Sequence, residues 1–164
     1  MTRGHAERLM PLVDAALTRA AWSVRDLEAV VVCTGPGGFT GARLGVAAAR
    51  GLALALGRPA IGVDWFATLA GDARARVALP GPQGVFWLQR FAGGMALGPV
   101  ETVAADDPAL RLRPGEIALG EPERAAAGAS ALAAAGMRAL RAGGAPRPAP
   151  LYLRPPDARP AAAQ

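Results

Sequence analysis

A short apolar segment, a glycine-rich loop and a long apolar helix follow one another without interruption between residues 29 and 56. Residues 29–33 are apolar and β-branched with no polar alternation, which predicts a strand buried on both faces and central in its sheet. Residues 35–41 form the glycine-rich loop, and residues 42–56 predict a helix rich in small side chains. Residues 60–63 then predict a second short strand. This order of elements predicts an α/β fold.

Further elements are expected on both sides of this unit. A helix is predicted over residues 12–21, and Pro11 either opens it or kinks a longer helix that begins near His5. Asp64 is expected to cap a helix that runs through Ala73. Beyond residue 80 the pattern predicts strands over 85–91, 95–103 and 116–119, a short helix over 108–112 capped by Asp107, an alanine-rich helix over 122–142 broken near Gly128, and a proline-rich strap over 143–164.

The composition excludes several kinds of chemistry. All 18 basic residues are arginine, so the chain has no Walker A lysine, no Schiff base and no lysine general base. Cys33 is the single cysteine, which forbids an internal disulfide and a multi-cysteine metal site, and His5 is the single histidine. We therefore expect no metal, no cofactor and no catalytic residue.

The positive charge is concentrated at the carboxyl end. Residues 1–137 carry 13 arginines against 12 acidic residues, whereas residues 138–164 carry five arginines against Asp157 alone. Such a tail can contact the phosphates of a nucleic acid or remain a solvated strap, so the net charge of +5 is a weak indication of nucleic-acid binding.

No membrane span is expected. The longest apolar run, residues 42–57, falls short of about 18 residues and contains Arg43 and Arg50. Charged residues also interrupt the first 20 residues, which argues against a signal peptide. The expected location is the cytoplasm.

The glycine loop is the strongest local candidate for a binding site. Glycines between a strand and a helix permit positive φ, and the following helix offers free N–H groups to an anion. A dinucleotide-binding fingerprint fails at its third position, where Thr40 stands, although Asp64 lies where a ribose-binding acid would. A tight packing turn without a ligand is an equally good interpretation. The candidate residues of a ligand site are Gly35, Gly37, Gly38, Thr40, Gly41 and Arg43.

The other polar residues give little indication of a catalytic or metal-binding site. Ser23 and Ser130 lie outside any nucleophile motif, and Cys33 inside an apolar strand is typical of a small core residue. A helix start explains Asp106 and Asp107 fully. We therefore expect no peptidase activity, because a hydrolase needs a nucleophile or a metal.

Several segments together resemble a known family. Residues 35–45, GPGGFTGARLG, are similar to the signature GPGSFTGLRIG, and residues 3–11 resemble an H-x-E-x-L-x-P helix. Residues 51–57 and 59–63 continue the match, and residues 150–155 are similar to a closing P-x-Y-L-R. In this order, over residues 3 to about 160, the chain resembles the TsaB family, accessory proteins of bacterial tRNA threonylcarbamoyladenosine synthesis.

The resemblance implies a truncated two-lobed α/β fold of the actin/Hsp70/sugar-kinase (ribonuclease H-like) superfamily, in the group also named Gcp-like or peptidase M22. It implies a non-catalytic scaffold that binds the catalytic paralogue TsaD as a heterodimer, meets TsaE through the complex, contacts tRNA indirectly and can form a homodimer when alone. By resemblance, the helix near His5 and the helix after the glycine loop bundle with helices of TsaD. The expected interface residues are His5, Glu7, Leu9, Pro11, Val13, Ala47 and Arg50.

This sequence departs from the family pattern in three places. Gly38 stands where a serine is usual, and residues 80–84 replace the usual Asp-Ala-Arg stretch. Relatives also begin with a strand carrying Asp-Thr-Ser and further strands, whereas Met1 falls where the first helix begins. We hypothesise that Met1 is an internal methionine or that the form is truncated. The strand over residues 29–33 is then expected to have an open edge.

The family pattern divides the chain into three parts: a first α/β lobe over residues 1–78 without its opening strands, a second smaller α/β lobe over 79–143, and a strap over 144–164. The alternative hypothesis for function is a nucleotide-binding enzyme, Rossmann or sugar-kinase-like, that uses the glycine loop.

Overall fold

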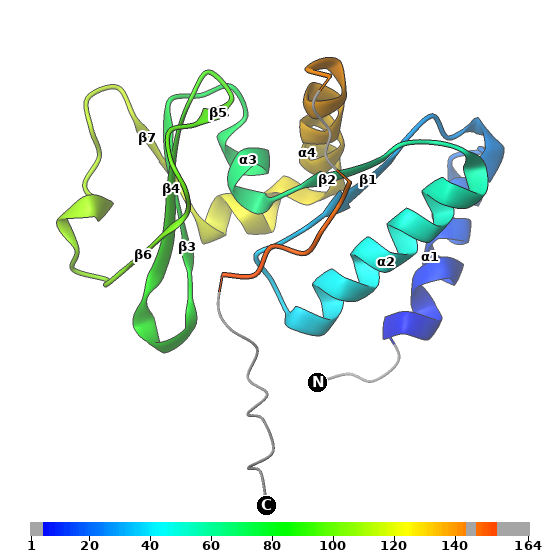
Figure 1. Cartoon of the computed structure of the whole chain (residues 1–164), viewed down its shortest axis with the longest axis horizontal. Coiled ribbons are helices and arrows are strands. Elements are labelled where there is room, and N and C mark those ends of the chain that lie inside the picture. The colour runs from blue at the N-terminus through cyan, green and yellow to red at the C-terminus, as the bar shows by residue number, and fades with distance from the viewer. Residues whose placement is uncertain (1–4, 144–146, 154–164) are drawn as a thin grey trace, which may run out of the picture.

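The computed structural model describes residues 5–143 and 147–153, and the side chains from residue 7 onward. Two sheets lie side by side with helices between and around them (Figure 1). The first sheet has two strands and the second has five. The predicted α/β class is confirmed.

The first sheet pairs β1 (Val30–Cys33) and β2 (Ala60–Val63) in parallel. Helix α2 (Phe39–Leu56) connects the two strands, and helix α4 (Glu121–Arg141) packs on the same sheet. Neighbouring residues of a strand face opposite sides of the sheet. Val32 meets Gly45 of α2, and Val31 meets Gly136 of α4, so the two helices cover opposite faces.

Strand β1 is less enclosed than its sequence predicts. Each of its four residues is half-buried, and among the described residues β1 pairs only with β2. The N–H groups of Val30 and Thr34 donate to β2 and its preceding residue, so those of Val31 and Cys33 point toward the other edge. The prediction of a central strand is therefore wrong for the described residues, because helices cover both faces while one edge has no strand beside it.

The second sheet is built around β3 (Ala75–Pro80). It pairs antiparallel with β4 (Phe86–Ala92) and parallel with β7 (Ile117–Leu119). The far edge of β4 pairs with β5 (Met95–Ala96) and then with β6 (Glu101–Val103). The single returning strand expected over residues 95–103 is thus two short strands.

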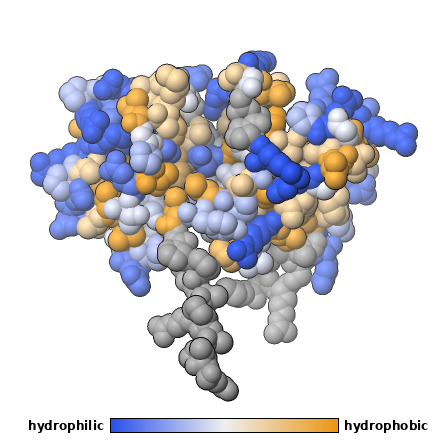
Figure 2. Space-filling view, in the orientation of Figure 1, coloured by the Kyte–Doolittle hydropathy of each residue, from blue (hydrophilic) through white to orange (hydrophobic). Residues whose placement is uncertain are grey.

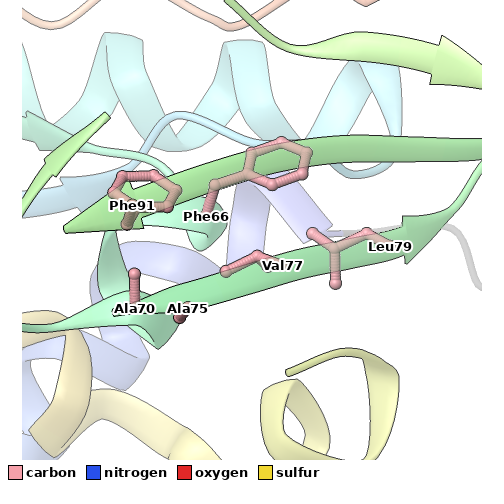
Figure 3. Packing of buried hydrophobic residues seen from close by; sticks show 6 residues of the cluster. All are labelled: Phe66, Ala70, Ala75, Val77, Leu79 and Phe91. Carbon is pink, nitrogen blue, oxygen red and sulfur yellow. The ribbon is translucent and has the colours of Figure 1, made fainter. Parts of the chain in front are cut away.

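The main core lies on one face of this second sheet. Ala75, Val77 and Leu79 alternate along β3 toward Phe91 of β4 and Phe66 of α3 (Trp65–Ala70), as Figure 3 shows. Phe66 and Val77 are fully buried. Burying one such side chain stabilises the fold by about 1.5–3 kcal/mol, so this cluster anchors α3 to the sheet.

The helices differ from their predicted bounds for local reasons. Helix α1 (His5–Arg19) is the longer of the two expected alternatives and contains Pro11. Helix α3 ends at Ala70 rather than Ala73, because Gly71 takes a φ of +53°. The predicted break in α4 is confirmed at Gly128, whose φ of +61° is not helical. Short 3-10 helices cover Val24–Asp26, Pro82–Gly84 and Pro108–Leu110.

Residues 147–153 run as an extended segment across the front of the molecule in Figure 1. They are the described part of the predicted strap, and from here on the strap means these residues only. The other residues of the predicted proline-rich segment, 144–146 and 154–164, lie outside the described residues. Strand β3 crosses the predicted lobe boundary at residue 78 and pairs only with strands of the second sheet. The division into lobes at that residue stays a prediction.

Candidate partner surface and the glycine loop

The glycines of the loop serve different purposes. Gly35 is buried with a φ of +131°, and a Cβ built there would lie 3.3 Å from the carbonyl oxygen of Leu151. Its own carbonyl accepts a hydrogen bond of 2.8 Å from the Trp65 N–H. At Gly37 and Gly38 a Cβ would meet open space, and so would one at Gly41, which lies in α2 because the helix begins at Phe39 rather than at the expected Ala42. Within this loop, close packing therefore requires a glycine only at position 35.

The strap occupies the ends of both strands of the first sheet. The N–H of Leu151 donates to the Thr34 carbonyl, which directly follows β1, over 2.8 Å. Pro148 lies against β2, where a Cβ on Gly62 would be 3.1 Å from its Cα. Open α/β sheets hold ligands outside the carboxyl ends of their strands. Here the chain itself covers that position.

Arg43 holds the strap to the start of α2. Its Nε donates a 2.7 Å hydrogen bond to the Tyr152 hydroxyl, and its guanidinium lies 3.7 Å from the centre of the Phe39 ring. The rings of Phe39 and Tyr152 are 5.2 Å apart between centroids. This cation–π cluster gives Arg43 a packing role that the sequence did not indicate, because Arg43 and Tyr152 are 109 residues apart.

Asp64 caps a helix. Its Oδ1 accepts a 2.7 Å hydrogen bond from the Ala67 N–H at the start of α3. Burial raises the pKa of the Asp64 carboxyl, and hydrogen bonds from the Ala67 and Phe66 N–H groups act in the opposite direction. The expected cap is confirmed, and this Oδ1 is directed to its own helix rather than to a ribose.

Cys33 is half-buried at the end of β1. Burial raises the pKa of its thiol, and a long contact of 3.9 Å from Sγ to the Gly35 carbonyl opposes the rise only partly. A raised pKa reduces the thiolate fraction at neutral pH, which agrees with a packing role for Cys33.

The residues expected to meet a partner fall into two groups. Glu7 and Pro11 on α1 and Ala47 on α2 are exposed. Half-buried positions are Leu9 and Val13, which lie one turn apart on α1, and Arg50 on α2. The side chain of His5 lies outside the described residues. The structure therefore places α1 and α2 at the surface, with their small and apolar residues only partly covered.

Three large apolar side chains on these helices were not singled out from the sequence. Met10 and Leu12 of α1 are 46% and 65% exposed, and Leu54 of α2 is 83% exposed. Only Val46, Ala49 and Ala53 are buried on the 18-residue α2. Figure 2 shows apolar surface over the part of the face where α2 lies in Figure 1. We call the exposed sides of α1 and α2 the two-helix surface.

Helix α1 has few contacts with the other helices and strands. Its half-buried residues Leu9, Val13 and Leu17 repeat every four positions, which is the apolar stripe of a lightly packed helix. Met10 and Leu12 lie outside this stripe. Their position outside the stripe is the signal in the sequence that would have identified them as exposed apolar residues. An extensive apolar surface on a soluble domain marks an interaction site.

Helix α2 is long and apolar enough to cross a membrane by length and composition, which corrects the expectation that this run is too short. It contains Arg43 and Arg50, and one of its sides packs on β1 and β2. We interpret it as a helix that covers a sheet and keeps an apolar outer side.

A buried ion pair supports the loop between β6 and β7. Arg90 pairs with Glu116, and their side chains are 10% and 0% exposed. Arg90 also donates to the carbonyls of Ala109 and Arg111, and Glu116 accepts from the Arg113 N–H over 2.8 Å. Burial alone would raise the pKa of Glu116, but these hydrogen bonds and charges outweigh it and lower the pKa.

The chain is similar to known proteins both in its fold and in its sequence. In fold, the chain is similar to YeaZ from Pseudomonas aeruginosa, with a TM-score of 0.69 and 23% identity over 93% of this chain and 86% of that one. The class is thus the mixed α/β, actin/Hsp70-like fold, as the sequence predicted.

In sequence, residues 1–83 match the family model described as TsaD, tRNA N6-adenosine threonylcarbamoyltransferase. An uncharacterized protein of Mycobacterium tuberculosis is 41% identical over 98% of this chain and 80% of its own length. The tRNA threonylcarbamoyladenosine biosynthesis protein TsaB of Escherichia coli is 37% identical over 53% of this chain and 41% of its own length. The chain belongs to the TsaB/Gcp-like family.

Proposed function

We propose that this protein is a non-catalytic scaffold in the synthesis of threonylcarbamoyladenosine in tRNA, and that it binds a TsaD-type paralogue through the two-helix surface. Family membership supports a part in this biosynthesis. The observation that carries the scaffold role is the exposure of apolar side chains on two helices, the 18-residue α2 and the lightly packed α1.

The two-helix surface has the chemistry of a helix-bundle interface. Ala47 and Gly51 are exposed small residues one turn apart on α2, which lets a second helix approach closely, and Leu54 provides an apolar anchor on the next turn. Leu12 adds a further exposed apolar group on α1. Packed helices lie about 8–10 Å apart between axes, and the distance depends on the side chains at the contact, so small residues favour the close end of this range.

Three observations support an accessory role over an enzymatic one. Among the described residues, no group of three or more His, Cys, Asp or Glu side chains is placed to hold a metal. The strap covers the carboxyl ends of β1 and β2, and Asp64 caps α3. The catalytic step then belongs to the paralogue, TsaE joins through the complex, and tRNA is contacted indirectly in the cytoplasm. Alone, the same surface can pair two copies of this chain.

Co-purification with a TsaD-type partner tests the proposal. Ala47→Arg places a long cation where a partner helix would approach, and Leu54→Asp removes the apolar anchor. We expect each variant to lose at least about tenfold in affinity for the partner, as substitutions at the centre of an interface do. Because both positions are exposed, the fold is expected to persist.

Matched controls separate the surface from the substitution. Ala133→Arg changes an exposed alanine of α4, and Leu97→Asp changes an exposed leucine beyond β5; both should bind like the wild type. If all four variants bind the partner equally well, the two-helix surface is not the interface. Circular dichroism of each variant confirms that a loss of binding is not a loss of fold.

A further inference from the structure

Arginine alternates with apolar residues along the outer side of α2. The residues that share this side, at the helical spacing i, i+4, i+7 and i+11, are Arg43, Ala47, Arg50 and Leu54. We call these four residues the α2 face. Arg43 and Arg50 lie about 10 Å apart along the helix axis, and so do Ala47 and Leu54, because each pair is separated by seven residues.

The charge in this part of the chain has one sign. Residues 29–63 contain Arg43, Arg50 and Arg58 and no acidic residue. None of the three ion pairs among the described residues involves these arginines. The acidic residues of the neighbouring α1, Glu7 and Asp14, therefore do not neutralise them. The α2 face is cationic, and no carboxylate of the described chain pairs with it.

We propose that the partner places on α2 an amphipathic helix whose carboxylates, about seven residues apart, pair with Arg43 and Arg50. The inference rests on the proposed function, because it describes the partner of the two-helix surface. Between its carboxylates, the partner helix presents apolar side chains to Ala47 and Leu54. Arginine suits such a contact, because its planar guanidinium can donate two parallel hydrogen bonds to one carboxylate.

A second copy of this chain fits the α2 face less well. In a symmetric contact between two α2 helices, the arginines of one copy meet those of the other, and residues 29–63 offer no carboxylate to separate them. Like charges brought together in an interface disfavour that pairing. The charge of the α2 face therefore selects a partner helix that is more acidic than α2 itself.

An RNA also fits less well. Phosphates would pair with the two arginines, but they would leave the Leu54 side chain, which is 83% exposed, without an apolar contact. A protein helix covers the arginines and Leu54 together. The alternation of charged and apolar residues on the α2 face therefore favours a protein over a nucleic acid.

Two substitutions at one position test the sign of the partner's charge. Leu54→Asp and Leu54→Arg both remove the apolar side chain, but they introduce opposite charges. We expect the TsaD-type paralogue to bind Leu54→Arg at least about tenfold more tightly than Leu54→Asp, because an acidic helix attracts the first and repels the second. Isothermal titration with the full chain measures both affinities. Equal affinities, or tighter binding of Leu54→Asp, overturn the proposal.

The dependence on salt tests Arg50. Arg50→Glu should lose at least about tenfold in affinity at about 0.1 M NaCl and recover part of this loss at about 1 M, because the screening length falls from about 10 Å to about 3 Å. The matched control is Arg111→Glu, an exposed arginine between β6 and β7, which should bind like the wild type at both concentrations. A loss at Arg50→Glu that is equal at the two concentrations would refute a role for its charge.

The outcomes separate this inference from the proposed function. If Ala47→Arg and Leu54→Asp lose the partner while Arg50→Glu binds like the wild type, the two-helix surface is the interface but the partner helix is not acidic. If none of these variants loses the partner, the proposed function and this inference fail together. If purified tRNA binds the wild type and Arg50→Glu weakens only that binding, the arginines serve RNA and the proposal is overturned.

Discussion

Gly136 of α4 lies so close to Val31 of β1 that a Cβ at position 136 would be 2.4 Å from the Val31 Cγ2 atom. Real Cβ atoms do not approach that closely, and the atoms around Val31 belong to a stiff β-branched side chain on a strand. The contact sets the distance between α4 and the first sheet.

The first prediction concerns this contact. Gly136→Ala should lower the free energy of unfolding by about 1–3 kcal/mol, because overpacking outweighs the better helix propensity of alanine. Urea unfolding followed by circular dichroism measures the change. Gly51→Ala is the control: its Cβ would meet open space, so the same substitution in α2 should stabilise by about 0.5–1 kcal/mol. Equal effects at the two positions would contradict the close contact.

The second prediction concerns the buried pair of Arg90 and Glu116. Glu116→Gln should cost about 2–4 kcal/mol at pH 7, because it leaves the buried Arg90 without its counter-charge. The pKa of Glu116 is lowered from its ordinary 4.5, so its contribution is complete above pH 4.5 and is lost as the pH falls through the lower folded value.

Unfolding measured between pH 7 and pH 3 checks both parts. The difference in stability between wild type and Glu116→Gln should shrink as the pH falls below 4.5. Glu28→Gln, at an exposed position, should stay within about 0.5 kcal/mol of the wild type throughout. A difference between Glu116→Gln and wild type that is independent of pH would mean that the Glu116 charge does not stabilise the fold.

The third prediction separates the cap of α3 from its charge. Asp64→Ala should lose about 1 kcal/mol, because the Ala67 N–H loses its acceptor. Asp64→Asn keeps an oxygen acceptor and removes a carboxylate whose pKa burial raises, so it should be at least as stable as wild type at pH 7. The protonated Asp64 carboxyl is favoured in the folded state, so the wild type loses free energy of unfolding as the pH rises through the raised pKa. Asp64→Asn has no proton to lose there and keeps its free energy of unfolding. Thermal unfolding at pH 4 and pH 7 tests the difference; equal losses for both variants at pH 7 would contradict it.

The fourth prediction concerns the glycine loop. We expect ATP and NAD to bind the isolated protein more weakly than millimolar, because the strap covers the strand ends beside the loop. Isothermal titration measures the affinity, and Thr40→Arg, at an exposed position in the first turn of α2, is a variant that should change nothing. Micromolar binding that Thr40→Arg removes would favour the alternative hypothesis of a nucleotide-binding enzyme.

Local patterns predicted most elements but missed β3, the strand at the centre of the second sheet. Ala75, Val77 and Leu79 alternate with Arg76 and Ala78 before Pro80, and this alternation is the pattern of a half-buried strand. The apolar run of β1 predicted a central strand, because such a run indicates burial on two faces but not which strands lie at its edges. The open edge seen among the described residues was expected only from the comparison with the family pattern.

The site residues show where sequence reasoning ends. Arg43 was a candidate residue of a ligand site, and its contact with Tyr152 depends on the path of a strap more than 100 residues away. The two-helix surface was placed on the correct helices, yet Met10, Leu12 and Leu54 emerged only from their exposure. Exposure depends on tertiary packing, which periodicity within one helix does not specify.

The hydrogen bond between Leu151 and Thr34 also sets an order of events in folding. The first sheet forms from residues 30–63, but its cover comes from residues 147–153, which lie far along the chain. Closing so long a loop is slow relative to forming the local strand, helix and strand unit. The ends of β1 and β2 therefore stay uncovered during folding until residues 147–153 dock on them.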